Sequence, residues 1–168
     1  MNRILVSLVI IIVLASCNEN AVTEKEFTGR ETVYALQPGS AYAISGTVTF
    51  KEKVDGKALV LIHLTGTEGD IQHPVHLHLG DISAPGAEIS AVLNPVIGKT
   101  GNSETILSKL ADESFVTYKD LLDMEACIKI HLAEYGPDRD IILAGGNIGE
   151  LGKSISSGRT EIGVCKSN

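Results

Sequence analysis

Two short β-strands around a histidine-rich segment decide the fold of this chain. Residues 59–81 read LVLIHLTGTEGDIQHPVHLHLGD. The apolar runs 58–64 and 75–79 have the length of strands, and a Thr-Glu-Gly-Asp turn at 67–70 lies between them. Alternate residues of a strand project from the same face, so His76 and His78 are predicted to share the face opposite the apolar side chains.

Short apolar runs of this kind recur along most of the chain, and turns that contain Gly, Pro, Asn or Asp separate them. With 17 Gly and only 4% aromatic residues, this pattern predicts an all-β fold, either an antiparallel Greek-key sandwich or a flattened barrel. One short helix is expected, with Thr117 as its N-cap and Asp120 as its capping-box partner. The expected strands are 32–36, 42–50, 58–64, 75–79, 89–93, 128–132 and 141–144, with 161–165 as a further candidate.

The size and charge of the chain bound its function. A length of 168 residues suits one compact domain. The formal net charge is -7, and the chain lacks the cluster of Lys and Arg that nucleic-acid binding requires. We therefore expect no nucleic-acid partner, and no sequence feature identifies a protein partner.

The N-terminus has the features of an export signal. Arg3 precedes an apolar segment at 4–14, which is too short to span a bilayer as a helix. The run Leu-Ala-Ser-Cys at 14–17 resembles the lipobox of bacterial lipoproteins, which implies removal of residues 1–16 and lipidation of Cys17. The alternative is an ordinary secretory signal with an incidental cysteine.

The lipoprotein interpretation divides the chain into three parts: the signal at 1–16, a lipidated N-terminus and tether at 17–29, and the β-domain at 30–168. It predicts a membrane anchor in the bacterial cell envelope. Asn18 is not the aspartate that retains some lipoproteins at the inner membrane, so the outer membrane is expected. In that oxidising compartment Cys127 and Cys165 are expected to form a disulfide, with two buried reduced thiols as the alternative.

The chain contains five histidines, and three of them lie at strand positions that place their side chains on the face opposite the apolar residues, where they could bind a metal. In the strand at 128–132, His131 lies on the face opposite Ile128 and Ile130. If this strand neighbours the strand at 75–79, then His76, His78 and His131 form an all-imidazole site on the outside of the sandwich. Imidazole suits copper, zinc, iron and nickel, and the affinity order of divalent ions favours copper. The alternative is a polar surface without a metal.

The two remaining histidines are expected to have structural roles. His63 alternates with apolar residues in the strand at 58–64, which predicts a half-buried, hydrogen-bonded side chain rather than a ligand. His73 precedes Pro74, which favours an extended backbone, and is expected to orient the loop before the strand.

Two segments resemble copper/zinc superoxide dismutases and the related CHRD domains. Residues 59–81 are similar to the dismutase strand, Thr-Glu-Gly turn and His-x-x-His-x-His motif that runs into Gly-Asp. Residues 127–149, CIKIHLAEYGPDRDIILAGGNIG, resemble the segment that holds a later copper ligand and ends in Gly-x-Ile-Gly. The resemblance implies that His76, His78 and His131 are copper ligands and that His73 is the structural histidine of the family.

The chain also departs from the dismutase pattern. The family has a bridging histidine and zinc ligands after its His-x-His motif, but residues 80–130 contain no histidine, so no such zinc site is expected. The positions of the substrate-steering arginine and of the disulfide cysteine correspond to Ile142 and Gly145. Without that guanidinium, attraction of the superoxide anion is lost, unless Arg139 replaces it.

Three functions fit these features. The first is a lipid-anchored β-sandwich that binds copper and has little or no dismutase activity, and no catalytic residue is assigned to it. The second is a copper-only superoxide dismutase. The third is a structural or adhesive surface domain in which the histidines bind no metal.

Overall fold

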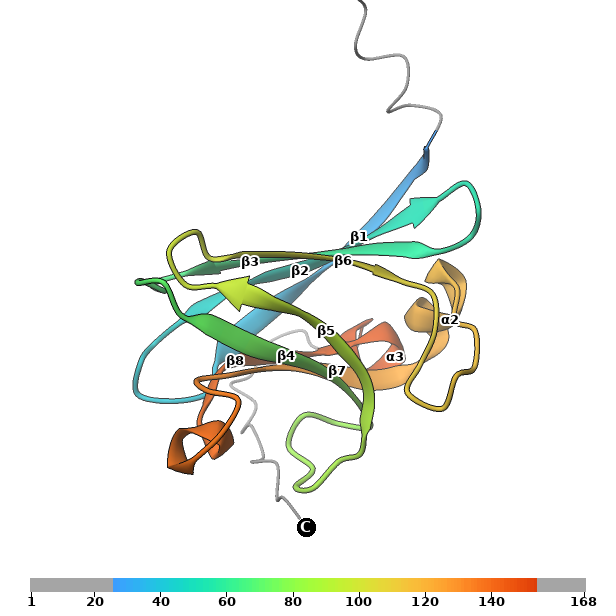
Figure 1. Cartoon of the computed structure of the whole chain (residues 1–168). Coiled ribbons are helices and arrows are strands. Elements are labelled where there is room, and N and C mark those ends of the chain that lie inside the picture. Colours follow the sequence, from blue (N-terminus) through green and yellow to red (C-terminus); the bar gives the residue numbers. More distant parts are fainter. Residues whose placement is uncertain (1–25, 154–168) are drawn as a thin grey trace, which may run out of the picture.

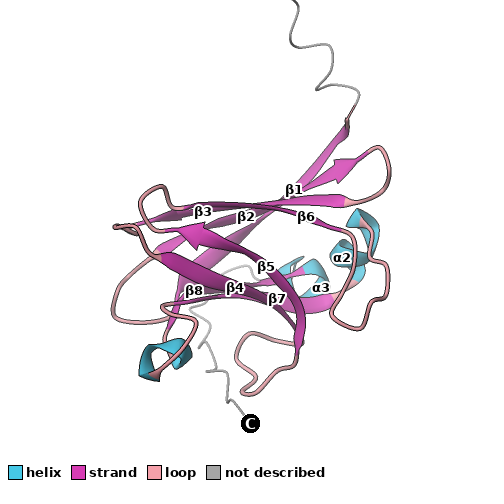
Figure 2. Ribbon diagram, in the orientation of Figure 1, coloured by secondary structure: helices cyan, strands magenta, loops and turns pink. Residues whose placement is uncertain are grey.

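The computed structural model describes residues 26–153. Eight strands and three short helical segments follow one another along this part of the chain (Figure 2). In chain order they are β1 (Phe27–Pro38), β2 (Ser45–Lys53), β3 (Ala58–Thr65), β4 (Gln72–Leu79), β5 (Ile89–Ile97), β6 (Asn102–Leu107), α2 (Tyr118–Asp123), β7 (Glu125–His131), the 3-10 helix η1 (Pro137–Asp140), β8 (Ile142–Ile148) and α3 (Gly149–Lys153).

The strands close into an antiparallel barrel in the order β1-β2-β3-β6-β5-β4-β7-β8. The strands β4, β5 and β6 are consecutive neighbours, and the chain then returns so that β7 lies beside β4. On the other side of the same three strands, β3 lies beside β6. This arrangement is Greek-key topology. Figure 1 shows the barrel flattened into two layers, with β1, β2, β3 and β6 in one and β4, β5, β7 and β8 in the other. The expected all-β Greek-key fold is therefore confirmed.

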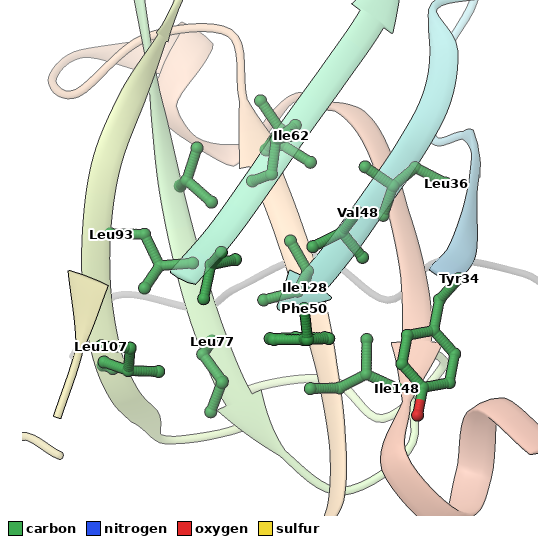
Figure 3. Packing of buried hydrophobic residues seen from close by; sticks show 14 of the residues in the cluster. Tyr34, Leu36, Val48, Phe50, Ile62, Leu77, Leu93, Leu107, Ile128 and Ile148 are labelled. Atoms are coloured by element: carbon green, nitrogen blue, oxygen red, sulfur yellow. The ribbon is translucent and has the colours of Figure 1, made fainter. Parts of the chain in front are cut away.

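The interior of the barrel is filled by buried apolar side chains from all eight strands, although β6 contributes only Leu107. Phe50 and Val48 of β2 are fully buried, and Tyr34 of β1 meets the Phe50 ring edge-on at a centroid distance of 5.9 Å. Leu77 and Ile128 come from the opposite layer, so side chains of both layers meet in one core (Figure 3). Where β8 meets β1, Gly146 leaves no room for a side chain, because a Cβ there would lie 2.2 Å from the Ala35 carbonyl oxygen.

Most predicted elements are present, with shifted ends. The helix at 118–123 has the expected capping box between Thr117 and Asp120. The predicted strand 42–50 is observed at Ser45–Lys53, and β1 begins at Phe27, so the last three residues of the expected tether belong to the barrel. The candidate strand 161–165 lies outside the described residues.

One strand and two helical segments were not predicted. β6 has a polar sequence, NSETIL, in which only Leu107 is buried. It is held in place by six Cα pairs with β3 rather than by an apolar face of its own. The segments η1 and α3 are only four and five residues long. Within residues 26–153, no helix is long and apolar enough to cross a membrane.

Candidate metal centre

Three histidines from two neighbouring strands meet on the outer side of the barrel. β4 pairs with β7 in antiparallel register, with His76 opposite Lys129 and His78 opposite Cys127. His131 ends β7, and one ligand nitrogen from each of His76, His78 and His131 lies within 4.8 Å of the other two. β4 and β7 are therefore neighbours, which was the condition for one site shared by the three histidines.

The closest approach in the cluster is between two ring nitrogens. His76 Nδ1 lies 3.2 Å from His131 Nε2, and the two rings are tilted with their centroids 4.8 Å apart. The His76 and His78 rings meet edge-on at a centroid distance of 5.8 Å. His76 therefore lies between the other two imidazoles.

Backbone carbonyls fix the orientation of the other two rings. His78 Nδ1 lies 2.9 Å from the Ala87 oxygen, and His131 Nδ1 lies 2.8 Å from the Arg139 oxygen. A carbonyl oxygen only accepts, so both Nδ1 atoms donate. In the neutral rings the Nε2 atoms of His78 and His131 then carry lone pairs, which is the state that binds a metal.

These donors fit one metal ion with little movement. Imidazole nitrogens bind zinc at about 2.0–2.1 Å, so two of them on one ion lie at most about 4.2 Å apart. The 3.2 Å between His76 Nδ1 and His131 Nε2 is within that limit. Two ligand nitrogens that are 4.8 Å apart, the upper limit for the cluster, would have to move about 0.6 Å closer together to bind the same ion. The three histidines could therefore hold a metal ion.

The cluster is buried, although it projects from the outer face as predicted. His78 is 0% exposed and His131 is 2% exposed, while His76 is partly exposed. Hydrogen bonds to Ala87 and Arg139 bring the segments after β4 and after β7 onto this face. The histidines lie on the outer face of the sandwich, as expected, but these segments lie against that face, so His78 and His131 are buried.

Burial keeps the cluster uncharged. The pKa of His76 is lowered to about 4, mainly by burial and in smaller part by the neighbouring His131 and His78 and by the Arg139 charge. Burial also lowers the pKa values of His78 and His131, and the Lys129 charge lowers both further. At neutral pH all three rings are therefore available as neutral ligands.

The other two histidines lie apart from the cluster. His73 is 4% exposed, and its Nδ1 donates to the Leu132 carbonyl oxygen at 3.1 Å, which ties the start of β4 to the residue after His131. His63 is exposed on β3, and its Nδ1 lies 2.8 Å from Asn102 Oδ1 on β6. The expected hydrogen bond of His63 is present, but its expected half-burial is wrong, because the side chain is exposed.

The groups that orient the ligands were not predicted from the sequence. Ala87 and Arg139 act through backbone oxygens, so no side-chain pattern could identify them. Asn147 was also missed, although it is the one polar side chain in the apolar strand Ile142–Ile148. It hydrogen-bonds to the segment that follows β4. A polar residue in a buried strand was the available signal.

The one cysteine within residues 26–153 belongs to no second metal-binding group. Cys127 is buried on β7, opposite His78, while Cys17 and Cys165 lie outside the described residues. The proposed lipid attachment and disulfide therefore stay predictions. Among residues 26–153, the three histidines form the one group of metal-binding side chains with suitable spacing.

Comparison with known proteins identifies no relative. No family profile, no curated protein and no solved structure matches this chain. Function has to be inferred from the histidine cluster and its surroundings.

Proposed function

We propose that this chain is a lipid-anchored protein of the bacterial cell envelope that binds one copper ion through His76, His78 and His131. The metal site is carried by one observation, the convergence of three neutral imidazoles from β4 and β7 within 4.8 Å, and the lipid anchor rests on the Leu-Ala-Ser-Cys run at 14–17. A surface histidine pair would not need two buried rings with their Nδ1 atoms held by carbonyls.

Copper is favoured by the donor set. All three ligands are imidazoles, with no carboxylate or thiolate among them. Such sites bind copper, zinc, iron and nickel, and Cu²⁺ has the highest affinity among the divalent ions. Three protein ligands also leave a coordination position open, whereas structural zinc sites are usually closed by four. The resemblance of residues 59–81 and 127–149 to dismutase segments points to the same metal.

We expect little or no dismutase activity. Residues 80–130 supply no bridging histidine, and Ile142 stands where the dismutase pattern has its arginine. A second candidate, a copper-only superoxide dismutase, is favoured by the positive charges of Lys129 and Arg139, which act on the cluster histidines. A cationic surrounding attracts a small anion such as superoxide.

Metal analysis of the full chain, purified from membranes in detergent, tests the copper site. We expect one copper per chain after loading and dialysis. His78→Ala and His131→Ala should each abolish this binding because two imidazoles hold copper poorly against solvent. His63→Ala is the matched control, since it removes an imidazole from the exposed face of β3 and should bind copper like the parent.

Two results would overturn parts of the proposal. If His131→Ala binds copper as well as the parent, the cluster is not the site and a structural or adhesive domain becomes the better interpretation. If the copper-loaded parent removes superoxide much faster than His131→Ala does, the dismutase candidate replaces the non-catalytic one. The mass of the N-terminal peptide tests the lipid on Cys17 separately.

A further inference from the structure

We propose that Asn147 is a positioning residue, which fixes the metal ligand His78 from two strands away through the loop at 80–88. Asn147 on β8 is opposite Cys127 on β7, and Cys127 is opposite His78 on β4. Neighbouring strands are about 4.8 Å apart, so the Asn147 and His78 backbones are separated by about 10 Å. Asn147 is therefore too far from His78 for a direct hydrogen bond, and the loop at 80–88 contacts both residues.

The Asn147 side chain is 5% exposed and uses both ends of its amide on the loop. Its Oδ1 accepts from the Ile82 backbone N–H at 2.8 Å, and its Nδ2 donates to Asp81 Oδ2 at 2.6 Å. The other Asp81 oxygen accepts from the Ser83 backbone N–H and hydroxyl at 2.9 and 2.5 Å. The amide orientation is thus specified at both ends, because a carboxylate only accepts and an N–H only donates.

This contact holds the first half of the loop against the barrel. Gly80 donates its N–H to the Glu125 carbonyl oxygen at 2.8 Å, and the Ile82 side chain next to the Asn147 contact is 1% exposed. Figure 1 shows the loop between β4 and β5 lying outside the layer that contains these strands. The loop is therefore anchored onto the outer face by β7 through Glu125 and by β8 through Asn147, although β8 itself carries no ligand.

The second half of the loop then meets the ligand. Ala87 lies six residues after Asp81, and its carbonyl oxygen accepts from His78 Nδ1 at 2.9 Å. This bond keeps the proton on Nδ1 and turns the Nε2 lone pair toward the cluster. If the Asn147 anchor is lost, the loop is released at Asp81 and Ile82, and we expect the Ala87 carbonyl to be held less firmly against His78.

The chemistry of the anchor allows a sharp test by exchange of partners. In Asn147→Asp the donor to Asp81 is lost, and two carboxylates face each other. In the double variant Asn147→Asp with Asp81→Asn, the new amide at 81 donates to the new carboxylate at 147. That carboxylate still accepts from the Ile82 N–H, so the anchor is restored with its donor and acceptor reversed.

The first measurement uses the full-length protein without metal. Long-range ¹H–¹⁵N spectra distinguish a protonated from an unprotonated ring nitrogen. We expect the parent to hold a slowly exchanging proton on His78 Nδ1, the Asn147→Asp variant to lose it, and the double variant to regain it. Asn94→Asp is the matched control, because Asn94 Nδ2 donates to the Glu104 carbonyl oxygen at 2.6 Å across the β5–β6 seam, away from the cluster. It should lower stability and leave the His78 signal unchanged.

The second measurement is a Cu²⁺ titration with electron paramagnetic resonance, and this part rests on the proposed copper site. Loss of an outer hydrogen bond to a ligand typically costs 10–100-fold in metal affinity, so we expect a loss of about that size in Asn147→Asp and wild-type affinity and spectrum in the double variant. A parent protein that binds no copper would refute the copper site, while the His78 proton signal would still decide the role of Asn147.

Two results would overturn the role of Asn147. One is a folded Asn147→Asp variant that keeps the His78 proton. The other is a double variant that does not fold, or that folds without this proton. If Asn147→Asp itself does not fold, the presence or absence of the His78 Nδ1 proton in the double variant alone decides whether Asn147 has this role.

Discussion

At the scale of single residues, His76 differs from the other ligands in the nitrogen it turns toward the cluster. His131 donates through Nδ1 to Arg139, so its neutral ring presents an accepting Nε2 to His76 Nδ1 at 3.2 Å. In the protein without metal, His76 must then be the donor and carry its proton on Nδ1. A metal that binds this nitrogen displaces the proton, so we predict that His76 changes to the Nε2–H form on loading.

Ring-nitrogen NMR of the metal-free protein and of a diamagnetic form loaded with Zn²⁺ or Cu⁺ checks this prediction. The His76 Nδ1 proton should be present before loading and absent after it, while His78 and His131 keep their Nδ1 protons in both states. A His76 ring that carries its proton on Nε2 before loading would contradict the prediction.

The ligand residues could be predicted from the sequence, but their surroundings could not. Alternation in β4 and β7 is enough to place His76, His78 and His131 on one face, because the side-chain period of a strand is two. Burial of that face depends on loops whose path is set by bonds such as His78 to Ala87. For the same reason, the exposure of His63 could not be inferred from its apolar neighbours.

At the scale of elements, the helix at 118–123 begins at a capping box that can be tested separately from the metal site. Thr117 Oγ1 accepts from the Asp120 N–H at 3.2 Å, and the Thr117 N–H donates to Asp120 Oδ2 at 2.9 Å. Replacement of an N-cap Thr by Ala typically costs about 1 kcal/mol. We predict that Thr117→Ala lowers the free energy of unfolding by about that amount.

Urea unfolding of the parent, Thr117→Ala and Thr117→Ser measures this effect. Serine keeps the accepting hydroxyl, so Thr117→Ser should be close to the parent. Equal losses in the two variants would mean that the methyl group of Thr117, rather than the cap, matters. Copper binding should be unchanged in both variants.

Elements with a pattern of their own were predictable, and those defined by their neighbours were not. The capping box is a local signal and identified the helix, while the apolar alternation around Val75 and Ile128 identified β4 and β7. β6 buries only Leu107 and pairs along its whole length with β3. A strand that depends on a partner distant in sequence leaves little trace in its own composition.

At the scale of the whole molecule, barrel closure brings the ligands and their supports together. β4 and β7 are neighbours only because β5 and β6 fold back in a Greek key, and β8 brings Asn147 beside them. The sequence could predict such a fold class, since short strands and glycine turns favour it. It could not fix the strand order, because alternation does not specify which strands pair.

The buried neutral histidines also make the stability of the whole barrel depend on pH. In the folded protein without metal, the pKa of His76 is lowered to about 4, mainly by burial, against an ordinary value of 6.5. Between these values the unfolded chain binds the proton that the folded chain excludes. The contribution of His76 to stability is therefore fully present above about pH 6.5 and is lost as the pH falls toward about 4. His78 and His131 act in the same direction, since their pKa values are also lowered, mainly by burial.

We therefore predict that the chelator-treated protein loses stability as the pH is lowered from about 6.5 to about 4, and that His76→Gln loses less over the same range. Each excluded proton contributes a slope of at most about 1.4 kcal/mol per pH unit. Urea unfolding of both proteins at a series of pH values measures the two slopes, and carboxylates that titrate in this range cancel in their difference. Parallel curves would mean that His76 takes up its proton equally well in the folded and unfolded states, and burial would then not keep the cluster neutral.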